Sequence, residues 1–185
     1  MNRNDLYEAA SVLRRGGIVA YPTEACYGLG CDPRNHAAIR RLLAVKRRSW
    51  SHGLILIAES LDRLLPYLAP VPPQACERAR ATWPGPHTWL WPAQAGVSRW
   101  LRGGHDSLAV RVTAHPGAAA LCRHARLPLV STSANRHGRR PARSAEESRR
   151  LFGNDIDYFL AGKLGGAEKP TEIRDVVSGA VVRPA

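Results

Sequence analysis

Lysine is scarce in this chain, which also lacks the segments that mark several protein classes. No apolar run approaches the roughly 20 residues that a membrane helix requires, so we expect no membrane association. The N-terminus lacks the apolar core of a secretory signal. These absences favour a cytoplasmic protein.

The cysteines and histidines show no metal-ligand spacing. The four cysteines contain no C-x-x-C pair, and the gaps after Cys31 are far too wide for a zinc knuckle. We therefore expect reduced, mostly buried thiols and no structural metal.

The familiar nucleotide and hydrolase signatures are also missing. The sequence has neither GxxxxGK[ST] nor GxGxxG, which argues against a P-loop ATPase and a dinucleotide-binding protein. It has no G-x-S-x-G, the nucleophile elbow of one large class of serine hydrolases.

Arginine supplies almost all of the positive charge. Of 27 basic residues only Lys46, Lys163 and Lys169 are lysine, and the net charge is +12. Arginine favours bidentate contacts with phosphate and carboxylate, which suggests an anionic substrate or nucleic acid. The alternative is a GC-rich genome and a solvated surface, but it leaves the lysine within Lys46-Arg47-Arg48 unexplained.

Length and apolar periodicity predict one α/β domain over residues 1–185. With 185 residues, 44% of them hydrophobic, the chain fits a single globular domain. Strands and hairpins alternate with helices, which predicts a mixed sheet covered by helices and not a doubly wound fold. We expect Asn4 to cap the first helix, Ser144 to cap the last, and residues 22–33 to form a loop. The predicted helices are 5–15, 35–45, 61–68, 74–81, 117–125 and 145–152, and the predicted strands are 18–21, 54–58, 87–91, 108–112, 129–130, 173–177 and 180–183.

Four segments next to predicted strands carry the unusual polar residues. They are 22–30, 46–48, 107–111 and 131–135. Ligands of α/β proteins bind where strand ends converge, so we expect these segments to share one cleft.

Three groups of residues in these segments suit an anion. Lys46 carries a compact ammonium charge and Arg48 a planar guanidinium group. The two together suit a polyphosphate, although a solvated helix end would look the same. Arg111 lies in an apolar strand and needs a partner, either an internal carboxylate such as Asp106 or a substrate carboxylate. The segment 131–135 places Ser131, Ser133 and Asn135 on one side, or forms an ordinary polar turn.

Taken together and in this order, these segments resemble the YrdC-like family of threonylcarbamoyl-AMP synthases, in particular its short bacterial TsaC-type members. The resemblance covers nearly the whole chain. The matching pieces are 21–25, 28–33, 46–48, 53–58, 83–86, 107–112, 130–135 and 171–175.

The resemblance implies a fold, a reaction and a set of binding residues. The fold would be a twisted mixed sheet with flanking helices around a basic concave groove. ATP, L-threonine and bicarbonate would give threonylcarbamoyl-adenylate and pyrophosphate, with Mg²⁺ bound through the ATP phosphates. L-Threonine would be bound by Thr23, Arg111 and Ser131. Lys46 and Arg48 would be catalytic and bind the ATP phosphates, and the nucleotide would be positioned by Ser107, Ser133 and Asn135.

The same resemblance implies partners. A transferase complex would use the product to form N6-threonylcarbamoyladenosine at position 37 of tRNAs that read ANN codons. Binding of tRNA or double-stranded RNA is a further expectation. Two rival readings are a pure RNA-binding protein that uses Trp50, Trp89 and Trp91 for stacking, and an enzyme that adenylates carbamate for another acceptor.

The chain departs from the family pattern in three places. Ser49 follows Lys46-Arg47-Arg48 where proline is frequent, and Cys26 stands where an apolar residue is usual. The strand 54–58 lacks a histidine that contacts threonine in longer members. The sequence leaves open whether Arg139, Arg140 and Arg143 cover the phosphates or form a solvated turn.

Overall fold

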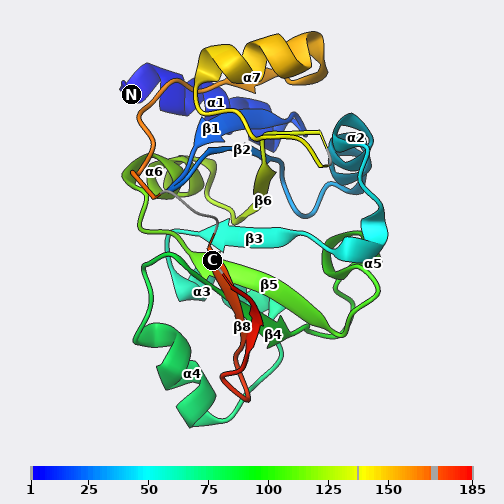
Figure 1. Cartoon of the computed structure of the whole chain (residues 1–185), viewed down its shortest axis with the longest axis vertical. Coiled ribbons are helices and arrows are strands. Elements are labelled where there is room, and N and C mark those ends of the chain that lie inside the picture. Colours follow the sequence, from blue (N-terminus) through cyan, green and yellow to red (C-terminus); the bar gives the residue numbers. More distant parts are fainter. Residues whose placement is uncertain (1, 137, 168–170, 185) are drawn as a thin grey trace.

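The computed structural model describes residues 2–136, 138–167 and 171–184 and shows a mixed α/β fold (Figure 1). Within these residues the strands form one nine-stranded sheet in the order β7-β1-β2-β6-β3-β5-β4-β8-β9. The strands are β1 Val19–Pro22, β2 Tyr27–Gly30, β3 Ile55–Ala58, β4 His87–Pro92, β5 Ser107–Val112, β6 Leu129–Ser133, β7 Tyr158–Phe159, β8 Glu172–Asp175 and β9 Val181–Arg183.

The helices lie around this sheet, as Figure 1 shows. In the part of the chain that is described, none is both long and apolar enough to cross a bilayer. The α-helices are α1 Arg3–Arg14, α2 His36–Lys46, α3 Leu61–Leu64, α4 Pro73–Arg80, α5 Arg99–Arg102, α6 Pro116–Ala125 and α7 Ala145–Phe152, and the 3₁₀-helices are η1 Trp50–His52, η2 Leu65–Tyr67 and η3 Gly153–Asp155.

The predicted mixed sheet is confirmed. Strand β3 pairs in parallel with β5 but antiparallel with β6, and β4 pairs antiparallel with β5 but in parallel with β8. The predicted C-terminal hairpin is β8 and β9, turning through Gly179 with a φ of 78°. Such a positive φ favours glycine.

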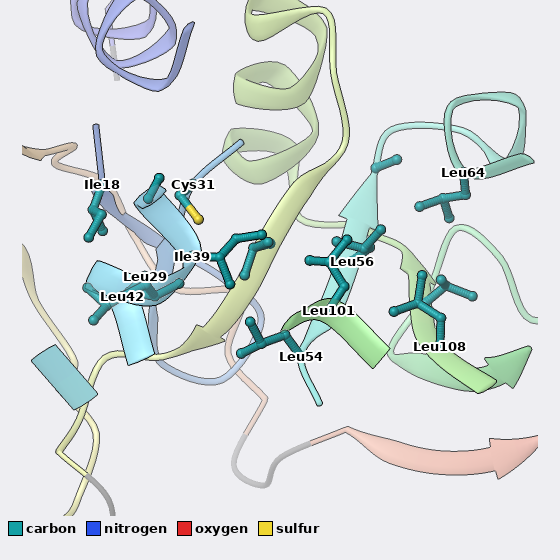
Figure 2. Close-up of a cluster of buried hydrophobic side chains, with 14 of the residues drawn as sticks. Ile18, Leu29, Cys31, Ile39, Leu42, Leu54, Leu56, Leu64, Leu101 and Leu108 are labelled. Atoms are coloured by element: carbon teal, nitrogen blue, oxygen red, sulfur yellow. The ribbon is translucent and has the colours of Figure 1, made fainter. Parts of the chain in front are cut away.

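Apolar side chains cover both faces of the sheet. Successive strand residues point to opposite faces, so Leu56 of β3 joins a larger cluster while Ile57 joins a smaller one with α1 and α6. Figure 2 shows the larger cluster, in which Ile39 and Leu42 of α2 lie on the same side as Leu29 of β2. The sheet core therefore fixes the strand ends that carry the polar residues.

Three local predictions were wrong. Asn2, not Asn4, caps α1, because its side chain accepts the N–H of Asp5 at 2.8 Å. The predicted helix 61–68 breaks into α3 and η2, since Pro66 lacks the N–H that a continuing α-helix needs. The predicted loop 22–33 contains β2, whose two glycines conceal a strand pattern.

Four further elements were not predicted, namely α5, η1, η3 and β7. Strand β6 extends through Ser133 into the expected polar turn. The extension matters for function because Ser131 and Ser133 become strand residues on one face.

Candidate functional site

A single cavity of about 600 Å³ brings together residues from all four polar segments. Its walls come from the β1–β2 turn, the stretch after α2, β3, β5, β6 and the C-terminal hairpin. The lining residues are Thr23, Ala25, Cys26, Tyr27, Gly28, Arg48, Gly53, Leu54, Ile55, Arg111, Ser131, Thr132, Ser133, Asn135, Arg140, Pro141, Arg143, Thr171 and Arg183.

The cavity is strongly basic. Among its lining residues in the described part of the chain there are five arginines and no aspartate or glutamate. Cationic groups without facing carboxylates in a concave, partly desolvated site attract anions. The arginines are Arg48, Arg111, Arg140, Arg143 and Arg183.

Arg111 both faces the cavity and has an internal partner. Its Nη2 lies 3.4 Å from Oε2 of Glu24, and its Nη1 donates to Oγ1 of Thr171 at 2.9 Å. Its Nε is buried and has no hydrogen-bond partner in the described residues. The internal carboxylate expected from the sequence is therefore present, with Glu24 in place of Asp106, and binding of a substrate carboxylate by Arg111 stays a prediction. The exposed Asp106 lies 3.8 Å from Arg102 instead.

Glu24 is held behind Arg111. The residue is 8% exposed, and its Oε1 accepts the hydroxyl of Thr113 at 2.7 Å. Oε2 has no hydrogen bond in the described chain and faces Arg111 alone. Glu24 therefore compensates the charge of Arg111 without lining the cavity.

Thr23 and Ser131 lie on either side of β2. The N–H and the hydroxyl of Thr23 both donate to the carbonyl of Cys26, at 3.1 and 2.7 Å, which closes the β1–β2 turn. Ser131 accepts the hydroxyl of the buried Tyr21 at 2.8 Å. The structure thus brings Thr23, Arg111 and Ser131 to one cavity, and their contacts with L-threonine stay a prediction.

Arg48 and Arg183 form a second cationic wall. Burial, and then the charge of Arg183, lower the pKa of Arg48, and burial followed by the charge of Arg111 lowers that of Arg183. Nε of Arg48 is buried and has no hydrogen-bond partner among the described residues. Crowded guanidinium groups with unused donors suit a polyanion such as a phosphate chain.

Lys46 lies beneath the cavity wall and not in it. It is 2% exposed, and its Nζ donates to the carbonyls of Ser133 and Asn135 and to Oδ1 of Asn135. These three acceptors match the three donors of an ammonium group. Burial first, and Arg48 second, lower its pKa to about 8. Lys46 therefore organises the 133–135 segment, and its expected contact with phosphate stays a prediction.

The other predicted nucleotide residues divide between two places. Ser133 and Asn135 line the cavity and are hydrogen-bonded to each other at 2.6 Å. Ser107 begins β5 opposite Pro92 of β4, at the far end of the strand from Arg111, and is not among the lining residues. The geometry brings Ser107 no closer to the other site residues, so its role stays a prediction.

Two of the three arginines whose role the sequence left open face the cavity. Arg140 and Arg143 line it, whereas the carbonyl of Arg139 accepts Nδ2 of Asn135. Arg143 donates its N–H to Oε2 of Glu147 at 2.6 Å and its Nη1 to the carbonyl of Ala25 at 3.3 Å. This segment is therefore tied down on both sides of the cavity.

Sequence reasoning assigned no role to Glu24, Tyr21, Thr171 or Arg183. The first three lie inside segments that carry the family resemblance, so their presence was visible but their contacts were not. Arg183 ends the predicted hairpin and looked like a surface residue. It reaches the cavity because β8 adds to the sheet beside β4, and its Nη2 donates to the carbonyl of Thr171 at 2.8 Å.

Comparison with known proteins agrees with this geometry. The model of the Sua5/YciO/YrdC family, described as telomere recombination, matches residues 11–185. A protein of Halorhodospira halophila named threonylcarbamoyl-AMP synthase is 59% identical over 175 residues, which cover 95% of this chain and 92% of that protein. A protein of Methylobacillus flagellatus with the same name is 56% identical over 172 residues, covering 93% and 95%.

The fold of this chain is also similar to solved structures of the same family. P. abyssi Sua5 complexed with L-threonine matches 92% of this chain with a TM-score of 0.86 and 31% identity. The match spans only 50% of the Sua5 chain, so the present chain corresponds to about half of that protein. With a family match over nearly all of its length, this chain belongs to the Sua5/YciO/YrdC family.

Proposed function

We propose that this protein is a threonylcarbamoyl-AMP synthase, which forms L-threonylcarbamoyladenylate and pyrophosphate from L-threonine, bicarbonate and ATP. One observation carries the proposal: a single cavity of about 600 Å³ holds both a carboxylate-binding arginine and a separate cluster of arginines suited to phosphates. That volume is within the usual range for small-molecule sites, roughly 300–1,000 Å³. The names of the relatives support the same activity.

The amino-acid end of the cavity is formed by Thr23, Arg111 and Ser131. Arg111 lines the cavity with a planar guanidinium group, which suits the carboxylate of an amino acid. The structurally similar P. abyssi Sua5 has been crystallised in complex with L-threonine, which supports this assignment.

The nucleotide end is formed by the arginines on the far wall. Arg48 and Arg183 would bind the phosphates, with Arg140 and Arg143 closing the site, and Ser133 and Asn135 would position the nucleotide. Mg²⁺ would enter with ATP and neutralise phosphate charge. Because no carboxylate lines the cavity among the described residues, the phosphates themselves would be its ligands.

The reaction then needs positioning and charge stabilisation more than covalent help. The threonine amine adds to bicarbonate or CO₂, and one oxygen of the resulting carbamate attacks the α-phosphorus in line as pyrophosphate leaves. Arg48 and Arg183 stabilise the negative charge that accumulates on the departing pyrophosphate. Lys46 holds the segment that carries Ser133 and Asn135, and thereby the nucleotide-binding wall.

The test is pyrophosphate release from ATP and Mg²⁺ by the purified protein. Release that requires both L-threonine and bicarbonate, and that serine and alanine do not support, is the expected result. Release that requires ammonium and bicarbonate but no amino acid would favour adenylation of carbamate for another acceptor. No release from folded protein would refute the proposed activity.

The proposed product implies partners and a location. Threonylcarbamoyl-adenylate is a mixed anhydride, so a transferase complex must take it to adenosine 37 of tRNAs that read ANN codons. We place this sequence of steps in the cytoplasm. Supplying the transferase components and such a tRNA to the pyrophosphate assay should yield the modified nucleoside, and the tRNA alone should not.

Binding of RNA is a second proposed activity, carried by the surface around Trp50. Trp50 is 38% exposed, and the guanidinium of Arg99 lies 5.5 Å from its ring. Trp89 and Trp91 are buried at 1% and 2% exposure and cannot stack on RNA. We expect tRNA affinity to fall steeply with salt and to weaken several-fold in Trp50→Ala. Unchanged tRNA binding in that variant would contradict a role for this surface.

A further inference from the structure

Tyr21 is a buried tyrosine of β1 whose hydroxyl reaches the cavity wall from behind. The residue is 0% exposed and does not line the cavity. Its hydroxyl donates to Oγ of Ser131 at 2.8 Å. Among the described residues, the hydroxyls of Tyr21 and Ser131 have no hydrogen-bond partner other than each other.

A glycine of β2 allows this contact. In the sheet order β1-β2-β6, the Tyr21 ring must cross β2 to reach Ser131 on β6. Gly28 is the cross-strand partner of Tyr21, and a Cβ there would lie 3.5 Å from Cζ of the ring. A Cβ on Gly30 would lie 2.8 Å from Cε1 of the ring, closer than carbon atoms approach. Gly30 therefore makes room for the ring, whereas a Cβ at Gly28 would make only an ordinary van der Waals contact with it.

In the hydrogen bond between Tyr21 and Ser131, the tyrosine hydroxyl is the donor. A phenol in a fully buried site keeps its proton, since burial raises the pKa of Tyr21 and the contribution of Ser131 only partly offsets it. Tyr21 donates, so Oγ of Ser131 accepts and the hydrogen of Ser131 is free for another acceptor. Because Ser131 lines the cavity, that acceptor belongs to a ligand.

The sheet register places this donor next to Arg111. Ser131 pairs with Ile55 of β3, and Arg111 of β5 pairs with Ile57 on the other side of that strand. Ile55 and Ile57 point to the same face, so Ser131 and Arg111 flank β3 on one side of the sheet. A carboxylate has two oxygens that could accept from both groups.

We propose that Tyr21 is a positioning residue that holds Ser131 as a hydrogen-bond donor to the carboxylate of the amino-acid substrate, beside Arg111. The proposal rests on the proposed function. Tyr21 does not touch the substrate, so it acts only through Ser131, and it affects the amino acid and not ATP.

The experiment is a double-mutant cycle on pyrophosphate release, with Tyr21→Phe, Ser131→Ala and the double variant. Tyr21→Phe removes only the buried hydroxyl and should raise KM for L-threonine about 5-fold to 10-fold, the size of one modest hydrogen bond. KM for ATP should stay within about 2-fold. Because Tyr21 acts through Ser131, the double variant should match Ser131→Ala alone, which is the non-additivity expected of a shared interaction.

The matched control is Tyr67→Phe, which removes a half-buried phenol outside the cavity and should leave both KM values unchanged. Additive losses in the double variant, an unchanged KM for L-threonine in Tyr21→Phe, or equal rises for both substrates would overturn the proposal. Absence of threonine-dependent turnover in the wild-type protein would instead refute the proposed function.

A second measurement applies if Tyr21→Phe does not fold. Ser131→Ala should weaken binding of L-threonine about 10-fold, measured by calorimetry without ATP, but leave binding of L-threoninol, which lacks the carboxylate, within about 2-fold. Equal weakening of both ligands would mean that Ser131 does not donate to the carboxylate, and the role of Tyr21 would fall with it.

Discussion

The buried pair of Glu24 and Arg111 makes a strong prediction about stability. Their side chains are 11% and 7% exposed, and Oε2 of Glu24 lies 3.4 Å from Nη2 of Arg111. Glu24→Gln keeps the size of the side chain but removes its charge. Removing one partner of a buried ion pair costs about 3–5 kcal/mol, because the remaining charge is uncompensated. We expect the free energy of unfolding to fall by that amount.

The expected loss is large enough to see in a melting experiment. For a domain of this size 1 kcal/mol shifts Tm by roughly 2–4 °C, so Glu24→Gln should lower Tm by about 6–20 °C. Asp106→Asn is the control, since Asp106 is fully exposed and loss of its 3.8 Å contact with Arg102 should leave Tm unchanged.

Removing both charges tests whether the loss of stability comes from the unpaired charge of Arg111 or from a general disruption of packing. In the Glu24→Gln background, Arg111→Met should recover part of the lost stability, since replacing a whole buried pair by apolar groups is often neutral. Urea unfolding of the four proteins gives the cycle. A Glu24→Gln variant within about 1 kcal/mol of wild type, or a double variant that loses the sum of both changes, would refute the reasoning.

Three further predictions concern the cavity wall. The pKa of Lys46 is lowered to about 8 from 10.5, so its buried charge costs stability below pH 8, and this cost is relieved as pH rises through that range. Relative to Lys46→Met, the wild type should therefore gain up to about 3 kcal/mol between pH 8 and 10.5 in urea unfolding; a pH-independent difference would contradict this. Gly30→Ala should cost about 1–3 kcal/mol, because its Cβ would lie 2.6 Å from the carbonyl oxygen of Val130 and 2.8 Å from the Tyr21 ring. Gly104→Ala, with only one atom within 4 Å, at 3.9 Å, should cost less than about 1 kcal/mol. Arg48→Ala should raise KM for ATP on the order of 10-fold or more and change KM for L-threonine little; equal changes for both substrates would reject Arg48 as a phosphate-binding residue.

The amphipathic helices were predictable because their apolar spacing alone specifies a buried face. The sequence therefore placed the helices that became α1, α2, α6 and α7 within a few residues, although it missed the cap of α1. Strand β2 was not predictable by the same rule. Its sequence, Tyr27-Gly28-Leu29-Gly30, has two glycines, which are uncommon in strands. One of the two glycines that hide the strand from a propensity argument, Gly30, is also the residue that lets the Tyr21 ring pass.

The carboxylate partner of Arg111 could not be identified from the sequence, for a different reason. The sequence shows that an arginine in an apolar strand needs a carboxylate, and proximity in the chain pointed to Asp106. The structure supplies Glu24 instead, because the β1–β2 turn folds over the end of β5 while Asp106 stays in solvent. Sequence distance gives no estimate of such a contact, which depends on the register of strands that are far apart in the chain.

The Lys46-Arg47-Arg48 cluster shows how one backbone conformation divides neighbouring charges. Its charge pattern alone predicts one basic surface. In the structure α2 ends at Lys46, whose side chain lies on the buried side of the helix, and Arg47 adopts a left-handed conformation with a φ of 52°. That residue reverses the course of the chain, so Lys46 points beneath the 133–135 segment while Arg48 enters the cavity. A left-handed residue other than glycine is uncommon, and no periodicity in the sequence signals it. The two cations that looked equivalent therefore have different positions: Lys46 supports the wall to which a nucleotide would bind, and Arg48 lines the cavity itself.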